Sequence, residues 1–239
     1  MDHGKKRVNL IILYSLLGIC IAAIAFFAYG VTKELYVRGQ GKSFYTTLSA
    51  SQPQIDFAAL SGQIPDIVAW LKCEDIGMDF PVVRGENNDY YLNHLPNGDS
   101  NYMGAIFMDY RNSADFSDKN SLIYGHALSS GDMFTVLKSY RNQAFYDEHP
   151  VISLYTPDNN YEIVLLAGYV VDSSVTSEIP PIHFADEAAF EQFLEEAKRR
   201  STFWSEAAAD ADDTLVTLAT CAYPSSVYRY VLVGKLTDM

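Results

Sequence analysis

The sequence predicts a mainly-β fold of about eight strands, closed as a barrel or packed as a sandwich, behind one N-terminal membrane-spanning helix. Three observations predict it. Short apolar runs separated by turn-forming residues fill the chain from residue 65 onward. Aromatic residues are frequent, with 17 Tyr and 13 Phe in 239 residues, as β-rich folds prefer. An uncharged apolar run occupies residues 8–32.

The expected strands are short apolar runs bounded by Gly, Pro, Asn and Asp. They lie at residues 67–71, 80–83, 105–108, 122–124, 151–155, 161–171, 214–221 and 228–236. Turn-forming sequences at 85–88, 96–99 and 157–160 separate several of them. Strands of this number and length predict a closed barrel or a sandwich.

Three helices are expected at the periphery of the strands. Asp56 can cap a short helix over residues 56–60. Apolar residues at helical spacing predict a second helix over 133–140. Asp186 can cap a longer helix with three basic residues at 198–200 in its last turn, where the helix dipole favours cations. The apolar face of that helix comprises Phe190, Phe193, Leu194 and Ala197.

The N-terminal run predicts a single-pass membrane protein. Residues 8–32 are long enough to cross a hydrocarbon core of about 30 Å as a helix, and they lack the polar stripe of a buried globular helix. Three basic residues at 5–7 precede the run, which places the N-terminus in the cytoplasm. The predicted order is a cytoplasmic tail (1–7), a transmembrane signal anchor (8–32), a juxtamembrane stalk (33–54) and an extracytoplasmic domain (55–239).

Charge and cysteine content exclude several classes of protein. The net charge of −13 argues against a nucleic-acid partner. Three cysteines cannot support a disulfide-stapled scaffold. The histidines and cysteines lack metal-ligand spacing, so no metal and no cofactor is expected. Cys20 and Cys73 are interpreted as packing residues.

Cys221 and Arg229 are the first candidates for chemistry. Cys221 ends one expected strand and Arg229 begins the next, after a short loop, so the two strands should pair antiparallel. Direct pairing would place the two Cα atoms on the order of 5 Å apart. Alternation puts Arg229 on the face of Val231 and Val233, which should look inward. A cation beside a thiol favours the thiolate and could hold an oxyanion; the alternative is a core cysteine near a surface arginine.

His126 is the third candidate. It follows the buried run 122–125, where a strand gives way to a polar loop, and a histidine there can reach the mouth of a barrel. An ordinary hydrogen-bonded surface histidine is the alternative that spacing alone leaves open.

Together these segments resemble the sortase family, most closely its class B branch. The sequence Thr217-Leu218-Ala219-Thr220-Cys221 resembles the sortase Thr-Leu-x-Thr-Cys motif. Tyr124-Gly125-His126 resembles the histidine segment, and residues 228–233 resemble the arginine strand. The order His, Cys, Arg and the N-terminal anchor also match. The resemblance to class B signatures extends to residues 67–71, 79–83, 89–93, 104–110 and 133–134, and to the helix expected after Asp186.

The resemblance implies a sortase-type closed β-barrel and cysteine transpeptidation at the cell surface. Cys221 would attack the threonine carbonyl of a C-terminal sorting motif in a secreted protein. His126 would serve as general acid and base, and Arg229 would stabilise the oxyanion. The acyl group would pass to an amine of a peptidoglycan precursor or cross-bridge, which anchors the protein to the wall.

The resemblance also implies a substrate groove lined by Asn88, Leu92 and Tyr124, with Thr220 beside the nucleophile. The sequence departs from the class B pattern at two positions. Ala219 stands where members often carry serine, and Ala222 where some carry an acidic residue. The recognised motif is therefore expected to deviate from the Asn-Pro-x-Thr-x type.

Three alternatives stay open on the sequence. A pilin-polymerising sortase would use a lysine of another pilin as acceptor. A hydrolytic cysteine peptidase would use water. A non-catalytic extracellular barrel module would need none of the three candidate residues.

Overall fold

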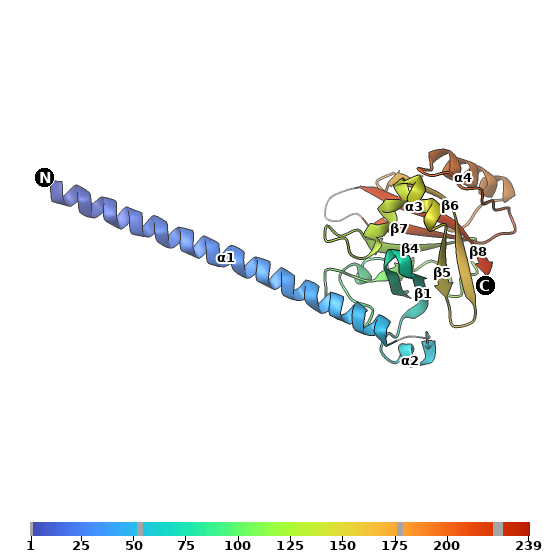
Figure 1. Cartoon of the computed structure of the whole chain (residues 1–239), viewed down its shortest axis with the longest axis horizontal. Helices are drawn as coiled ribbons and strands as arrows, with labels where there is room; N and C mark the ends of the chain where they lie inside the picture. Colours follow the sequence, from blue (N-terminus) through green and yellow to red (C-terminus); the bar gives the residue numbers. More distant parts are fainter. Residues whose placement is uncertain (1, 52–54, 176–178, 222–226) are drawn as a thin grey trace. The chain divides into compact units, whose positions relative to one another are not determined.

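The computed structural model describes residues 2–51, 55–175, 179–221 and 227–239, and for residues 2–9, 11 and 221 it describes the backbone alone. The described chain forms two compact units, Met1–Phe44 and Tyr45–Met239. The second unit carries all eight described strands, several of which are labelled in Figure 1.

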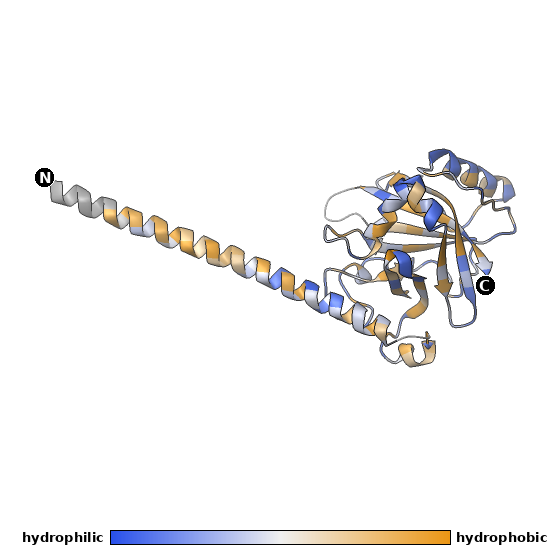
Figure 2. Cartoon of the chain, viewed as in Figure 1, coloured by the Kyte–Doolittle hydropathy of each residue, from blue (hydrophilic) through white to orange (hydrophobic). Residues whose placement is uncertain are grey.

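The first unit lies within the helix α1 (Asp2–Ala50). Among the described residues, α1 is the one helix that is long and apolar enough to cross a membrane. The apolar side chains described in the predicted span, such as Leu13 and Phe26, are exposed. Figure 2 shows hydrophobic residues along much of this helix. Such exposure in a long apolar helix is compatible with a membrane-spanning segment. The helix continues through residues 33–50, most of the predicted stalk, and its last turn belongs to the second unit.

All eight predicted strands are present. They are β1 (Ile67–Cys73), β2 (Met78–Val83), β3 (Ile106–Met108), β4 (Asn120–His126), β5 (Val151–Tyr155), β6 (Asn160–Asp172), β7 (Leu215–Cys221) and β8 (Tyr228–Asp238). They close into a barrel in the order β1-β2-β3-β4-β7-β8-β6-β5. The prediction of a closed barrel of about eight strands is confirmed.

Two neighbouring pairings position the candidate site. Strands β4 and β7 run parallel, in a ladder that ends at His126 opposite Cys221. Strands β7 and β8 run antiparallel, as the short connection between them predicts, up to Ala219 opposite Val231. The carboxyl ends of β4 and β7 and the start of β8 therefore lie together at one edge of the barrel.

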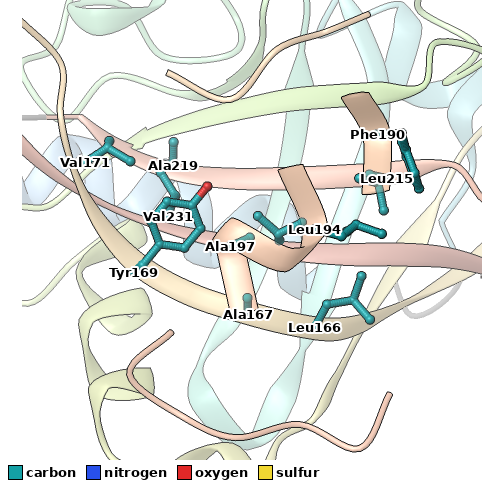
Figure 3. Packing of buried hydrophobic residues seen from close by; sticks show 11 residues of the cluster. Leu166, Ala167, Tyr169, Val171, Phe190, Leu194, Ala197, Leu215, Ala219 and Val231 are labelled. Atoms are coloured by element: carbon teal, nitrogen blue, oxygen red, sulfur yellow. The ribbon is translucent and has the colours of Figure 1, made fainter. Parts of the chain in front are cut away.

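The helix α4 (Glu187–Arg200) covers the outer face of β6, β7 and β8 (Figures 1 and 3). The Asp186 side chain caps it by accepting a hydrogen bond from the Ala189 N–H, as predicted. Its apolar face packs on the strands in one cluster, which we call the α4 cluster. Its members are Leu166, Ala167, Tyr169, Val171, Phe190, Leu194, Ala197, Leu215, Ala219, Val231 and Val233.

The α4 cluster corrects one expectation. Val231 and Val233 are buried, as expected, but beneath α4 on the outer face of the barrel rather than in its interior. The physical reason is that α4 excludes water from the outer face of β8. Both faces of the strand are therefore apolar, and alternation alone cannot show which face is directed to the barrel interior.

The smaller helices agree only in part with the prediction. Asp56 caps α2 (Phe57–Ser61), as expected. The predicted helix over 133–140 is the 3-10 helix η3 (Phe134–Arg141), which begins after Met133 at a φ of 59°. Three short elements were not predicted because they are too short to show a period. They are η1 (Glu74–Ile76), η2 (Tyr90–Leu92) and α3 (Gln143–Glu148).

We predict that Leu194→Ala lowers the free energy of unfolding of the barrel unit by about 2–4 kcal/mol, because it removes a buried side chain and leaves a cavity in the α4 cluster. Denaturant unfolding of the full chain in detergent checks this. The matched control is Glu195→Ala on the exposed side of α4, which should unfold like the parent. Equal stability of the two variants would contradict the assigned packing.

Candidate active site

A cavity of about 430 Å³ opens at the edge of the barrel where β4, β7 and β8 meet. Its lining includes five residues that the sequence analysis proposed for the site: Asn88, Leu92, Tyr124, His126 and Arg229. Its wall is largely apolar and includes Phe107, Leu122, Ala219 and Val231. Side chains from distant parts of the chain therefore converge on one pocket of a size suited to a ligand.

The position of Cys221 is fixed by its backbone. It is the last residue of β7, and its Cα is the ladder partner of His126 in β4. Neighbouring strands lie about 4.8 Å apart, so the backbone of Cys221 is adjacent to that of His126, which lines the cavity. The side chain of Cys221 and all of Ala222 lie outside the described residues.

His126 is oriented by a backbone carbonyl. Its Nε2 lies 2.7 Å from the carbonyl oxygen of Leu92. Because a carbonyl oxygen only accepts, Nε2 must carry a proton, and Nδ1 is the ring nitrogen that gains and loses one. Burial lowers the pKa of His126, and the hydrogen bond to Leu92 opposes this only in part. The imidazole is therefore biased towards the neutral form, with its basic lone pair on Nδ1.

Arg229 is held by the strand that pairs on its other side. It lies opposite Val171 of β6, and the start of β8 is fixed by Ser173, whose N–H and hydroxyl each donate to the Val227 carbonyl at 2.8 Å. The Nε of Arg229 is buried and has no hydrogen-bond partner among the described residues. The guanidinium therefore brings an unused donor to the lining of the cavity.

Asp109 organises one side of the cavity, and the sequence analysis did not single it out. Its fully buried carboxylate accepts hydrogen bonds from the Asn88 amide (3.0 Å), the Tyr124 hydroxyl (3.2 Å) and the Arg111 guanidinium (2.9 and 2.8 Å). Burial would raise the pKa of Asp109, but the hydrogen bonds from Arg111 and Asn88 hold it below its usual value. The sequence feature that could have identified Asp109 is its position directly after a buried strand.

The remaining predicted residue, Thr220, is placed differently. Its side chain is buried, and its hydroxyl accepts a hydrogen bond from the Tyr230 N–H at 2.9 Å. It is not among the described residues that line the cavity. Thr220 therefore links β7 to β8 next to Arg229. Leu92, in contrast, lines the cavity and also provides the carbonyl that accepts from His126.

Within the described residues there is no cluster of three His, Cys, Asp or Glu side chains able to hold a metal ion. The chemistry that the described site offers is that of an imidazole, a guanidinium and a cysteine position at one edge of a barrel. Such a set suits nucleophilic acyl transfer.

Comparison with known proteins agrees with this geometry. Residues 71–237 match the sortase domain family. Sortase B of Listeria monocytogenes is 34% identical over 173 residues, which cover 72% of this chain and 70% of the relative. Sortase B of Staphylococcus aureus is 30% identical over 199 residues, which cover 82% of this chain and 81% of the relative.

A solved structure shows the same architecture. The Staphylococcus aureus sortase B–substrate complex superposes with a TM-score of 0.73 at 28% identity, covering 87% of this chain and 97% of that chain. The fold and the sequence together define a cysteine transpeptidase barrel. The chain belongs to the sortase family, in its class B branch.

We predict that His126 titrates below the ordinary histidine value of 6.5 and is protonated on Nε2 in its neutral form. Nitrogen-15 NMR of labelled histidines in full-length Cys221→Ala protein measures the pKa and shows which ring nitrogen carries the proton. The His126→Gln variant assigns the signal. Because the folded pKa is the lower one, the unfolded chain binds the proton more readily, so this group costs stability as the pH falls below about 6.5. A pKa above 6.5, or a proton on Nδ1 in the neutral form, would contradict the assigned geometry.

We predict that Asp109→Asn raises the KM for a peptide substrate on the order of ten-fold, because it removes the charge that holds Asn88, Tyr124 and Arg111 in place. Asp158→Asn, in the exposed turn between β5 and β6, is the matched control and should leave KM unchanged. Steady-state kinetics at neutral pH are informative because the lowered pKa keeps Asp109 ionised there. An unchanged KM in Asp109→Asn would show that the network does not shape the substrate site.

Proposed function

We propose that this class B sortase is a membrane-anchored enzyme that cleaves a C-terminal sorting motif after threonine and joins the new acyl group to a peptidoglycan amine. The observation that carries the proposal is the pairing of His126 with Cys221 at the edge of a cavity that Arg229 also lines. These three residues supply a nucleophile position, a proton carrier and a donor for developing negative charge.

In the first half-reaction the Cys221 thiol passes its proton to Nδ1 of His126, and the sulfur attacks the carbonyl carbon of the substrate threonine. The carbonyl oxygen becomes negatively charged, and the guanidinium of Arg229 donates hydrogen bonds to it. The carbon–nitrogen bond then breaks, and His126 gives the proton on Nδ1 to the leaving amine. The products are a thioester on Cys221 and the released C-terminal peptide.

In the second half-reaction an amine attacks the thioester carbonyl. The proton of the attacking amine passes to Nδ1 of His126, and Arg229 again stabilises the oxyanion. The carbon–sulfur bond then breaks, and the departing sulfur takes the proton back from Nδ1. Cys221 is regenerated and a new amide bond joins the two partners. The apolar wall of the cavity supports this outcome, because a protected thioester reaches an incoming amine before bulk water hydrolyses it.

The substrate strand would lie along the apolar wall, with Asn88, Leu92 and Tyr124 on one side. The Staphylococcus aureus relative has been solved with a substrate bound, which supports use of this cavity for a sorting signal. Ala219 in the wall offers only a methyl group, so the part of the substrate against it must be apolar or satisfy its own polar groups.

The anchor completes the proposal. The apolar helix over residues 8–32 would hold the enzyme in the membrane with residues 1–7 in the cytoplasm, residues 33–54 as the stalk and residues 55–239 outside the cell. Basic residues at 5–7 support this orientation. The catalytic domain would then face secreted proteins and wall precursors.

The test uses the full chain in detergent with a library of threonine-containing peptides and three amines: triglycine, diaminopimelate and a lysine peptide. We expect cleavage after threonine, a thioacyl adduct at Cys221 visible by mass spectrometry, and an amide product with a wall-type amine. Cys221→Ala should abolish cleavage, while Cys73→Ala, the matched cysteine control outside the cavity, should retain it.

The alternatives give different products. A lysine-linked product alone would favour a pilin-polymerising sortase. The free acid with or without amines would favour a hydrolytic peptidase. Absence of any adduct at Cys221 would favour a non-catalytic barrel, and cleavage by Cys221→Ala equal to the parent would refute the proposed mechanism.

A further inference from the structure

The last turn of α1 is built into the barrel unit. Tyr45 and Leu48 are buried there, and the Tyr45 ring packs edge to face on Phe80 with centroids 5.6 Å apart. The Ser49 hydroxyl donates to the carboxylate of Asp79 in β2. These contacts fix the turn against the β1–β2 hairpin.

The hydroxyl of Tyr45 reaches the loop that precedes β3. It donates a hydrogen bond of 2.7 Å to the carbonyl oxygen of Gly104, which is itself buried. Burial raises the pKa of Tyr45 well above its usual value. The hydroxyl therefore keeps its proton, and remains a donor, at neutral pH.

Gly104 lies close to Leu92 and His126, with no room for a side chain between them. Its φ of +63° lies in the left-handed region, and a Cβ built there would lie 2.6 Å from the Tyr91 carbonyl oxygen and 2.8 Å from that of Leu92. The same Cβ would lie 3.1 Å from Cδ2 of the His126 ring. A shift of residue 104 towards these atoms must therefore move the Leu92 carbonyl or the imidazole.

We propose that Tyr45 is a positioning residue of His126: its hydroxyl holds Gly104 in place, and Gly104 in turn fixes the Leu92 carbonyl that orients the imidazole. The inference rests on the proposed role of His126 in proton transfer. It assigns to the end of the N-terminal helix a part in organising the active site, beyond its connection to the membrane segment.

The experiment compares Tyr45→Phe with the parent in full-length protein in detergent. In a Cys221→Ala background, nitrogen-15 NMR should show the neutral His126 proton on Nε2 in the parent. In Tyr45→Phe the two ring-nitrogen shifts should move towards each other, as in a mixture of tautomers. With Cys221 present, kcat on the sorting peptide should fall about three- to ten-fold with KM within about two-fold, because orientation rather than binding is lost.

Two controls separate positioning from packing. Tyr36→Phe removes an exposed hydroxyl from the same helix, one that accepts a hydrogen bond from Gln40, and should match the parent in every measurement. Leu48→Ala removes buried packing from the same turn as Tyr45, and should lower Tm without changing the tautomer.

The proposal is overturned if Tyr45→Phe leaves both the tautomer and kcat unchanged. It is also overturned if Leu48→Ala disturbs the tautomer as much as Tyr45→Phe, because the effect then belongs to packing. The NMR comparison needs no turnover, so it decides this inference even if the parent fails to act on any sorting peptide, which would defeat the proposed function instead.

Discussion

The in-register parallel pairing of β4 with β7 is the constraint on which the site depends. The ladder of seven residue pairs brings the carboxyl ends of both strands, and with them His126 and Cys221, to the same edge of the barrel. A slip of one residue would move every side chain of β7 to the opposite face. Buried polar contacts oppose such a slip: the Thr217 hydroxyl donates to the Asn120 side-chain oxygen at 2.9 Å, and the Asn120 amide donates to the Pro181 carbonyl at 2.8 Å. Because an unpaired buried polar group costs on the order of 1–3 kcal/mol, these bonds help to specify the register.

The polar groups around the cavity differ in how much of their hydrogen-bonding capacity is used within the protein. That difference decides which of them can interact with a bound molecule. The carboxylate of Asp109 is neutralised by Arg111 and saturated with donors, so it serves as a scaffold rather than as a base. His126 keeps one ring nitrogen tied to a backbone carbonyl, which leaves its titrating nitrogen as the basic one. Arg229 retains a buried donor without a described partner. Although the chain carries a net charge of −13, the lining of the cavity thus combines an imidazole biased towards the neutral form with a guanidinium. The proposed mechanism uses the first as a base and the second for the developing negative charge.

Much of the fold could be predicted because its determinants are local. The strands follow from apolar runs between turn formers, and the α4 cap follows from Asp186. The antiparallel pairing of β7 with β8 follows from a short connection. The parallel pairing of β4 with β7 was not predicted, because it depends on contacts between distant segments. The network of Asp109 and the hydrogen bond of Thr220 to β8 were not predicted for the same reason: a side chain's hydrogen-bond partners are set by tertiary packing, and no sequence period reveals them.

The stability of the barrel and the shape of its cavity depend on the same strands. Ala219 and Val231 belong to the α4 cluster and also line the cavity. The outer face of the barrel at β7 and β8 is therefore covered by α4 at one end and borders the cavity at the other. Ala219 is small enough to serve both purposes, since a larger side chain would fill the pocket and a polar one would need a partner beside an apolar wall. The apolar packing that holds α4 in place therefore also supports the wall of the cavity. Under the proposed function, a well-packed wall would present the scissile carbonyl to the cysteine position with little loss of conformational entropy on binding.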